Sequence, residues 1–466
     1  RLDQIANNPS FQRLGQRLFE LAKGSSVNLQ DASKGELFNW GYVVYKKIWR
    51  DFGLHTLIDS LVTGRGIQFS LSNACFLMVI QHLLQPRSKL ATFKNQTRYW
   101  QLPSVGYNHL YRALDIMADN KEVLEQAIFE RNRTLFNMQV DVVFYDVTTF
   151  SFESVKADSL RDFGFSKDAK FKEVQVVLGL IIDCEGRPIG YELFPGNTFD
   201  GKTMAKALES MEKRFGLRRV IIVADRGINS KLNLKLIRDR GYDYIVAARI
   251  KSMKSSVQQA ALDPKGYTAL TNPNTEETEF RYKTLPYTNV VKDETGKVHH
   301  LKEQLIVTYS PKRANKDRAD RQRLVEKAER LLENPAQIRS SNRRGGKKYL
   351  KNIGDEPDWT LDKEAIEKDT RFDGYYGIQT SVQDLTATEI IDAYHNLWKI
   401  EESFRIMKST LEVRPIFHWT ETRIRGHFLI CFLAFLLERT LETKLKNLEP
   451  KPSPAEIQEA LNSLNF

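Results

Sequence analysis

The sequence predicts an α/β protein: a mixed five-stranded sheet with flanking helices, preceded by a helical N-terminal domain and interrupted by a long insertion. Three observations predict this arrangement. The opening part of the chain has the 3.6-residue period of amphipathic helices, five β-branched and aromatic runs follow it, and two helical patterns separate the last of these runs. The chain has 466 residues, more than one hydrophobic core usually organises, so several structural units are expected.

The helical N-terminal domain is predicted to span residues 1–140. Turn-forming residues interrupt the helical period at Gly24, Gly53, Gly64–Gly66 and Pro103. Lysine and arginine are scattered through the whole segment. We therefore expect several short helices rather than one long one.

The strand-like runs begin at residue 141. They are VVFYDVTTFSF, KEVQVVLGLIID, RPIGYELF, RRVIIVAD and YDYIVAAR. Helical patterns at residues 201–215 and 230–240 lie between the later runs, and each is followed by a glycine, Gly216 and Gly241. Strands separated by a helix pair in parallel, whereas the first three can form an antiparallel meander. The ribonuclease H-like (RNase H-like) fold is one solution, and residues 141–250 are predicted to be its first part.

A long insertion is predicted over residues 251–370. It contains short β-like pieces (EFRYKTL, EQLIVTYS), a highly charged helix over Ala314–Leu332, and the basic stretch SNRRGGKKYLK at 341–351. An interval of this length is too long for a loop, so a largely β insertion with one charged helix is expected.

The second part of the sheet domain is predicted over residues 371–440. It opens with the strand-like YYGIQTS and continues into a long helix from Thr386 to Glu412, whose start has the capping-box spacing of Thr386 and Glu389. Residues 441–466 are expected to form a helical tail.

The charge balance favours a polyanionic partner. Seventy Lys and Arg residues against 59 Asp and Glu give a formal charge of +11 and a pI near 9.3. Nucleic acid is the partner class that this balance favours, although a basic enzyme of another kind remains an alternative. The longest apolar run, Phe428–Leu437, is about half the length needed to cross a bilayer, so a buried helix and a cytoplasmic protein without a membrane partner are expected.

Cysteine and histidine patterns indicate no zinc site. Cys75, Cys184 and Cys431 are odd in number and far apart, which argues against a disulfide framework and against a zinc-binding spacing. The eight histidines show no H-x-x-x-H or HExxH spacing, and no Walker-type glycine loop is present, so neither zinc nor ATP is implied.

Two aspartates stand where metal-dependent phosphoryl transfer needs hard oxygen ligands. Asp146 lies inside the apolar run DVVFYDVTTF, where a charge is costly unless it faces a metal or a solvated cleft. Asp225 ends the run VIIVAD, and ligands of α/β sheets gather at the C-terminal ends of strands. The alternatives are a carboxylate on an open face of the sheet for Asp146 and a turn or helix cap for Asp225.

A third carboxylate is expected from the helix predicted over Thr386–Glu412. Offsets of 7 and 14 residues from Tyr394 place Glu401 and Lys408 on one face of that helix. Glu401 then lies at the border of the apolar face, whereas Glu402 points further away and is the alternative ligand. Tyr394 and Lys408 are candidates for contacts with DNA phosphates.

The segments YDVTTF and VADRG, with the pattern Y-x-x-L-x-x-x-E-x-x-x-x-x-x-K, resemble bacterial insertion-sequence transposases of the DDE type. That family carries a Tyr-Arg-Glu-Lys signature with spacings of two, three and six residues. Tyr394, Glu401 and Lys408 match three of its positions, while Leu397 occupies the arginine position. Arg405, one turn beyond Glu401, is the hypothetical substitute for the missing phosphate contact.

The resemblance extends from about Asp141 to Arg439, through PGNTFDG, RFDGYYGIQT and RIRGHFLICFLAFLLER. It implies an RNase H-like catalytic core in which Asp146, Asp225 and Glu401 are the catalytic metal ligands, with two Mg²⁺ ions, for which Mn²⁺ can substitute. The partners implied are double-stranded DNA, as terminal inverted repeats and target, and a second copy of the chain in the DNA complex. Bacterial cytoplasm, with association to the nucleoid when DNA is bound, is the expected location.

Further residues are given roles by the resemblance. Thr148 and Thr149 follow Asp146 and are candidates for orienting it or a metal-bound water, whereas Asn197 and Arg226 resemble positions near the family's active site. The alternatives are the ordinary roles of threonine in a strand and asparagine in a turn. The N-terminal domain is expected to recognise DNA ends or to dimerise, and the insertion to hold the transposon end. Trp359 is the candidate for stacking on a flipped base, with a place in the hydrophobic core as its alternative.

The expected activity is cut-and-paste transposition: hydrolytic nicking at the ends of the element, followed by attack of the freed 3′ hydroxyl on target DNA. Two alternatives stay open on the sequence. One is an RNase H-like nuclease that only hydrolyses, and the other is a non-catalytic DNA-binding protein derived from a transposase. The presence of all three carboxylates argues against the second.

Overall fold

The structure, a computed structural model, places most of the chain. The described residues are 12–22, 37–136, 138, 140–164, 172–217, 220–271, 278–334, 337–338, 345–353 and 358–465. The chain forms two compact units. Unit 1 comprises the chain up to residue 223, residues 240–242 and residues 396–466, and unit 2 comprises residues 224–239 and 243–395.

The predicted helical N-terminal domain is found as a series of short helices in unit 1. They are α2 (Gln12–Ala22), α3 (Tyr42–Asp51), α4 (Leu54–Ser60), α5 (Leu71–Leu84), α6 (Lys89–Asn95), the 3₁₀ turn η1 (Gln96–Arg98), α7 (Tyr107–Asp119) and α8 (Lys121–Phe136). Gly53 separates α3 from α4 with a φ of 64°, a value that glycine adopts without strain.

The sheet of unit 1 begins with the predicted meander. β1 (Val142–Ser151) pairs antiparallel with β2 (Gln175–Asp183), which pairs antiparallel with β3 (Pro188–Pro195). β4 (Ile221–Ala224) lies on the other side of β1, so the order is β3-β2-β1-β4. The mixed α/β class is confirmed, and this order fits the RNase H-like arrangement expected from the sequence.

The remaining elements of unit 1 cover this sheet and the N-terminal helices. They are η2 (Asp200–Lys202), α9 (Met204–Lys213), α15 (Trp398–Arg405), the π-helical turn η6 (Ile406–Thr410), α16 (Glu421–Leu445) and α17 (Pro454–Ser463). The stop expected at Gly216 is present, since α9 ends at Lys213 and Gly216 has a φ of 63°.

Unit 2 is built on a second set of strands. They are β5 (Asp243–Ala247), β6 (Thr268–Thr271), β7 (Thr278–Lys292), β8 (Val298–Tyr309) and β11 (Tyr375–Thr380), in the antiparallel order β5-β11-β8-β7-β6. The strands of the predicted insertion thus share one sheet with β5 and β11. The compact units therefore follow boundaries other than the predicted ones, and the five-part domain scheme stays a prediction.

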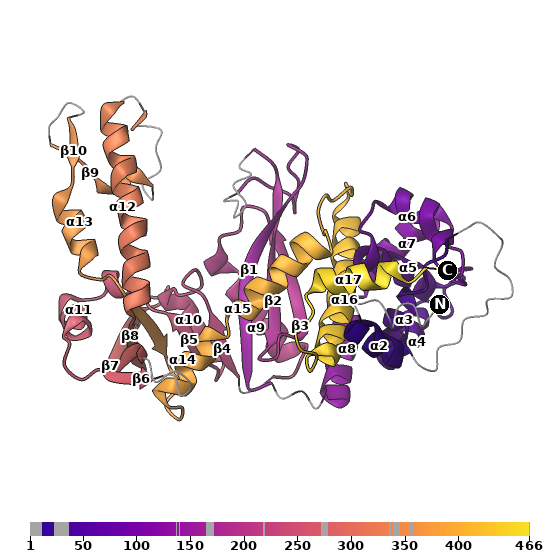
Figure 1. Ribbon diagram of the computed structural model, residues 1–466, viewed down its shortest axis with the longest axis horizontal. Helices are drawn as coiled ribbons and strands as arrows, with labels where there is room; N and C mark the ends of the chain where they lie inside the picture. The colour runs from indigo at the N-terminus through magenta and orange to yellow at the C-terminus, as the bar shows by residue number, and fades with distance from the viewer. Residues whose placement is uncertain are drawn as a thin grey trace. The chain divides into compact units, whose positions relative to one another are not determined.

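The helices of unit 2 include the predicted charged one. They are α10 (Lys231–Asp239), η3 (Ile250–Ser252), α11 (Ser255–Leu262), α12 (Pro311–Glu333), η5 (Gly346–Tyr349), α13 (Lys363–Thr370) and α14 (Ala387–His395). α12 contains the expected Ala314–Leu332 segment and packs against η5 and the hairpin of β9 (Leu350–Asn352) and β10 (Trp359–Leu361) (Figure 1).

α16 is the central helix of unit 1. It has 25 residues, and every residue from Phe428 to Leu437 is at most 1% exposed, which confirms the buried helix expected there. α16 packs against α3, α5, α7, β3 and η6. The Phe428–Leu437 segment of α16 is apolar all round and needs such neighbours on every side. None of the helices in the described part of the chain combines the length and the hydropathy needed to span a bilayer.

Glu438 is a buried acid on α16. The Tyr45 hydroxyl donates a hydrogen bond of 2.5 Å to its Oε2 atom. Burial, reinforced by the neighbouring Glu442 carboxylate, raises the pKa of Glu438 to about 8. The protonated form is therefore the one that the folded protein favours.

We predict that the contribution of Glu438 to the free energy of unfolding falls as the pH rises from the unfolded pKa near 4.5 to about 8, because in this window the unfolded chain releases a proton that folded Glu438 retains. Glu438 contributes a slope of at most about 1.4 kcal/mol per pH unit. In Glu438→Gln this contribution disappears. Urea unfolding of both proteins at several pH values between 5 and 8 measures the difference, and a difference that does not change with pH contradicts the prediction.

Candidate active site

Asp146 lies in the middle of β1, a largely buried strand of unit 1. It is half-buried, and the Val147 amide donates a hydrogen bond of 2.7 Å to its Oδ1 atom. Side chains alternate along a strand, so Asp146, Thr148 and Phe150 share one face of β1, while Thr149 is on the other. Both threonines are buried, each 4% exposed. Thr148, but not Thr149, is therefore on the side of the carboxylate.

The signature lysine lies over the same face of β1. Lys408 Nζ is 5.6 Å from the centre of the Phe150 ring, and Phe428 of α16 meets that ring edge-on at 5.3 Å. α15 packs against β1. Unit 1 thus brings Asp146 together with the helical segment that carries Glu401 and Lys408.

Glu401 and Glu402 have different environments. Glu402 is half-buried and accepts a hydrogen bond of 3.2 Å from Arg439 Nη1 of α16, and Arg405 approaches its other oxygen at 3.5 Å. Glu401 is exposed and has no hydrogen bond or ion pair to any residue that the structure describes. Glu402 is thus engaged with the core of unit 1, and Glu401 is available to a ligand.

The prediction of one continuous helix from Thr386 to Glu412 is wrong, because α14 ends at His395 and α15 begins at Trp398. The chain turns through Asn396 and Leu397 with i→i+3 hydrogen bonds, from the Lys399 amide at 3.1 Å and the Ile400 amide at 3.1 Å, and α15 then widens into η6. A 3₁₀ turn overwinds and a π turn underwinds the helix, so residues on either side no longer keep a 3.6-residue phase. Tyr394, Glu401 and Lys408 therefore do not form one helical stripe. Tyr394 belongs to unit 2, and Glu401 and Lys408 belong to unit 1.

Asp225 is the first residue after β4 and belongs to unit 2. The Gly227 amide donates to its Oδ1 atom at 2.7 Å, the geometry of an Asx turn. The carbonyl of Arg226 accepts a hydrogen bond of 3.0 Å from Arg249. These contacts hold the backbone that follows the strand, so the turn expected as the alternative role of Asp225 does exist.

Tyr394 and Tyr376 form a pair that sequence reasoning missed. Their hydroxyls are 2.6 Å apart, and the Arg313 guanidinium lies 4.4 Å above the Tyr376 ring. Burial raises the pKa of Tyr376, the charge of Asp225 also raises it, and the hydrogen bond from Tyr394 lowers it. Asp225, Tyr376 and Tyr394 are therefore neighbours in unit 2. The doublet in YYGIQT was the only sequence signal for Tyr376.

A pocket of about 290 Å³ opens beside this pair in unit 2. Its lining includes three arginines from separate segments, Arg226, Arg249 and Arg313, together with Tyr376. The remaining charges in its wall include ion pairs such as Lys251 with Asp369 at 2.8 Å. The predicted supporting residue Arg226 thus lies in a cationic pocket next to Asp225.

Comparison with known proteins identifies the family of this chain. The family model described as "Transposase DDE domain" matches residues 139–437, well over half of the chain. The chain belongs to the DDE transposase family. No curated protein matches it. A solved structure of similar shape is a cryo-EM structure of the piggyBac transposase synaptic complex with hairpin DNA, with a TM-score of 0.40 and 9% identity over 92% of this chain and 80% of that one.

The donor set of the transposase fits divalent ions of the kind that DDE enzymes use. Carboxylate oxygens are the ligands that Mg²⁺ and Mn²⁺ prefer. Glu401 is exposed and free of internal partners among the described residues, and Asp146 is a half-buried carboxylate in a largely buried strand. Both features agree with a role as metal ligands.

Other predicted positions of the transposase are engaged within the protein. Asn197 is exposed and donates a hydrogen bond of 2.7 Å to Asp162, in the loop after β3. Arg405 is exposed, at 73% of its side-chain surface, beside Glu402. Leu397, at the arginine position of the signature, is 7% exposed and belongs to the hydrophobic core. No phosphate contact can be made from that position.

The basic stretch at 341–351 and a second basic segment, Arg423–His427, form internal contacts in the transposase. In the first, Ser341–Arg344 lie outside the described residues, and Lys347 lies 5.4 Å above the ring of Trp359, which is half-buried on β10. In the run Arg423–His427, Arg425 pairs with Glu421 at 2.7 Å and His427 is buried. These contacts favour structural roles over free phosphate-binding surfaces, and Trp359 fits its alternative place in a packed cluster.

We predict that Glu402→Ala lowers the free energy of unfolding of the transposase by about 1–3 kcal/mol, because the buried Arg439 loses one of its carboxylate partners. Glu401→Ala is expected to change stability by less than about 0.5 kcal/mol, as is usual for a surface residue without partners. Urea denaturation of the two variants side by side measures this contrast. Equal destabilisation by both changes is incompatible with the assignment of Glu402 to the core.

Proposed function

We propose that this transposase carries out cut-and-paste transposition of an insertion sequence. Asp146, Asp225 and Glu401 hold the metal ions for hydrolytic nicking at the element's ends, and the same site then promotes attack of the freed 3′ hydroxyl on target DNA. The observation that carries this proposal is the exposed carboxylate of Glu401, free of described partners, on the segment that packs over the Asp146 face of β1.

Asp225 is included because of its place in the chain. It directly follows β4, and β4 neighbours β1 in the sheet, with the Ile221 amide donating 2.8 Å to the Asp141 carbonyl at the start of both strands. Asp225 is four residues beyond Ile221 and Asp146 is five beyond Asp141, so the two side chains leave neighbouring strands at a similar level and can converge on one ligand. This arrangement supports Asp225 as the partner of Asp146.

Two Mg²⁺ ions, or Mn²⁺ in their place, would activate the attacking oxygen and stabilise the leaving oxygen. The chain's own residues have other tasks. The three carboxylates carry the negative charge that such cations require. Thr148, which is buried on the same face of β1 as Asp146, is assigned a supporting position. Lys408, Arg405 and Tyr394 hold DNA phosphates around the scissile bond. Arg226 and Asn197 are assigned supporting positions.

DNA is the proposed partner, both as terminal inverted repeats and as target, bound by two copies of the chain. The net charge of +11 supports a polyanionic ligand. Residues 1–140 are assigned to end recognition or dimerisation, 141–250 and 371–440 to the catalytic core, and 251–370 to holding the transposon end, followed by the tail at 441–466. A bacterial cytoplasmic location, at the nucleoid when DNA is bound, accords with this partner.

The decisive test is a Mg²⁺-dependent cleavage and strand-transfer assay. The substrate is DNA that carries the element's flanking inverted repeats, with a supercoiled plasmid as target. Asp146→Ala, Asp225→Ala and Glu401→Ala are each expected to lower cleavage at least about 100-fold, since each removes a metal ligand. Retained cleavage in any of them overturns that residue's assignment.

Glu402→Gln is the matched control, because it changes the neighbouring carboxylate while keeping its size. It is expected to retain cleavage in Mg²⁺ at near the wild-type rate. Cleavage by the wild type without strand-transfer products would instead identify a nuclease. End binding without any cleavage would identify a DNA-binding protein that has lost catalysis.

The phosphate-binding role of Lys408 and Arg405 predicts a change in salt dependence. Lys408→Ala and Arg405→Ala should each weaken binding to transposon-end DNA and reduce the slope of log affinity against log salt by about 0.9. Fluorescence anisotropy over a range of salt concentrations measures both effects. Lys213→Ala, which alters an exposed lysine of α9 far from the signature in sequence, is the control and should leave affinity unchanged. An Arg405→Ala protein with wild-type end binding and cleavage rules out Arg405 as a substitute for the signature arginine.

A further inference from the structure

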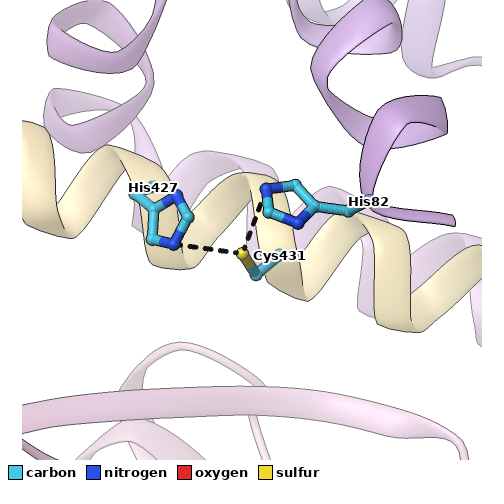
Figure 2. Close-up of side chains that lie close together, drawn as sticks. All are labelled: His82, His427 and Cys431. Atoms are coloured by element: carbon cyan, nitrogen blue, oxygen red, sulfur yellow. Dashed lines mark hydrogen bonds between the residues drawn. The ribbon is translucent and has the colours of Figure 1, made fainter. Parts of the chain in front are cut away.

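Unit 1 contains a buried cluster of metal-binding side chains apart from the three catalytic carboxylates. His82 comes from the last turn of α5, and His427 and Cys431 lie one turn apart on one face of α16 (Figure 2). Cys431 Sγ is 3.6 Å from His427 Nε2 and 3.8 Å from His82 Nε2. All three residues are buried, and their ligand atoms lie within 4.8 Å of one another.

We propose that His82, His427 and Cys431 bind one transition-metal ion, Zn²⁺ by the type of the ligands, which joins α5 to α16. Imidazole nitrogen with thiolate sulfur is a donor set typical of Zn²⁺ and unsuited to Mg²⁺. The site is distinct from the proposed carboxylate site in its residues and in its ion. Nothing in the cleavage chemistry requires it.

The spacing of the ligand atoms fits a tetrahedral ion. Zn–N distances of about 2.0–2.1 Å and a Zn–S distance of about 2.3 Å place nitrogen and sulfur about 3.6 Å apart at a tetrahedral angle. The two sulfur–nitrogen distances given above agree with this separation. Side-chain movements that bring the two imidazole nitrogens to about 3.3 Å from each other complete the tetrahedral geometry.

The hydrogen bonds around the cluster prepare His82 for this role. His82 Nδ1 is 2.9 Å from the Leu411 carbonyl, to which it donates, so Nε2 keeps its lone pair and faces Cys431. A backbone carbonyl that fixes the other ring nitrogen is the usual support of a metal-bound histidine. His427 Nε2 is 3.0 Å from the Val413 carbonyl, so ion binding requires its proton to move to Nδ1.

Hydrogen bonding alone leaves part of the cluster unexplained. Nδ1 of His427 and Nδ1 of His418 are buried without a hydrogen-bond partner among the described residues. The His418 ring lies 5.2 Å from that of His427, which makes His418 the candidate for a fourth ligand. His82, His418 and His427 all border a pocket of about 610 Å³, which gives an ion a path to the cluster.

Lys89 opposes binding and thereby offers a sharp test. It is 5% exposed, and its Nζ atom lies 3.5 Å from His82 Nε2. An ammonium so close to a ligand atom repels a cation, and its side chain must turn away when the ion binds. Removal of this charge should therefore strengthen binding.

The test uses the full chain without a histidine tag and with the three substitutions Asp146→Ala, Asp225→Ala and Glu401→Ala. Ions bound by the proposed catalytic carboxylates then cannot contribute to the result. Elemental analysis is expected to find one Zn²⁺ per chain. Titration with Co²⁺ should give the visible bands of a tetrahedral ion and a thiolate-to-cobalt charge-transfer band. Lys89→Met should raise Co²⁺ affinity at least about tenfold.

Cys431→Ala should abolish the charge-transfer band, whereas Cys184→Ala, at a half-buried cysteine outside the cluster, should retain it. If Cys431→Ala does not fold, the Co²⁺ spectrum of the protein that retains Cys431 still tests the proposal. Absence of the thiolate band from that protein, or its persistence in a folded Cys431→Ala protein, overturns the proposal.

Discussion

The burial of α16 on all sides is the constraint on which unit 1 depends. Each large apolar side chain that this helix removes from water contributes about 1.5–3 kcal/mol, and its Phe428–Leu437 segment has no polar face to turn outward. It packs against the N-terminal helices α3, α5 and α7 and against strand β3 of the sheet. This explains why the N-terminal helices and the strand that carries Asp146 belong to one compact unit, although the sequence suggested separate domains.

The same helix determines which acid of α15 is available. Arg439 of α16 is buried, and a buried guanidinium needs carboxylate partners. Glu402 and Glu442 provide them, at 3.2 and 2.8 Å. Glu402 is thus committed to the core, and its neighbour Glu401 points to solvent. The different exposure of these two adjacent glutamates therefore follows from a charge on a helix 37 residues further along the chain, and it supports the proposed choice of Glu401.

Local patterns in the sequence were sufficient for the strands β1–β5 and for the helix stops at Gly216 and Gly241, because alternation and positive φ are properties of short segments. They could not give the pairing of β5 with β11 or the Tyr376–Tyr394 contact, which join distant segments. The cluster of His82, His427 and Cys431 was not predicted for the same reason. His427 and Cys431 have a helical spacing, but His82 is far away in sequence. The turn at Asn396–Leu397 was not predicted because nothing in that dipeptide forbids a helix.

That turn has a consequence for the transposase signature. The chain passes from unit 2 to unit 1 between Tyr394 and Glu401, so the signature is divided: Tyr394 shares unit 2 with Asp225, and Glu401 and Lys408 share unit 1 with Asp146. Leu397 lies at the passage and is buried, which replaces an expected phosphate contact by hydrophobic anchoring of α15. A single arginine at this position would put a charge into the core next to α15. The departure from the family pattern at Leu397 thus fixes the start of α15 in the hydrophobic core of unit 1.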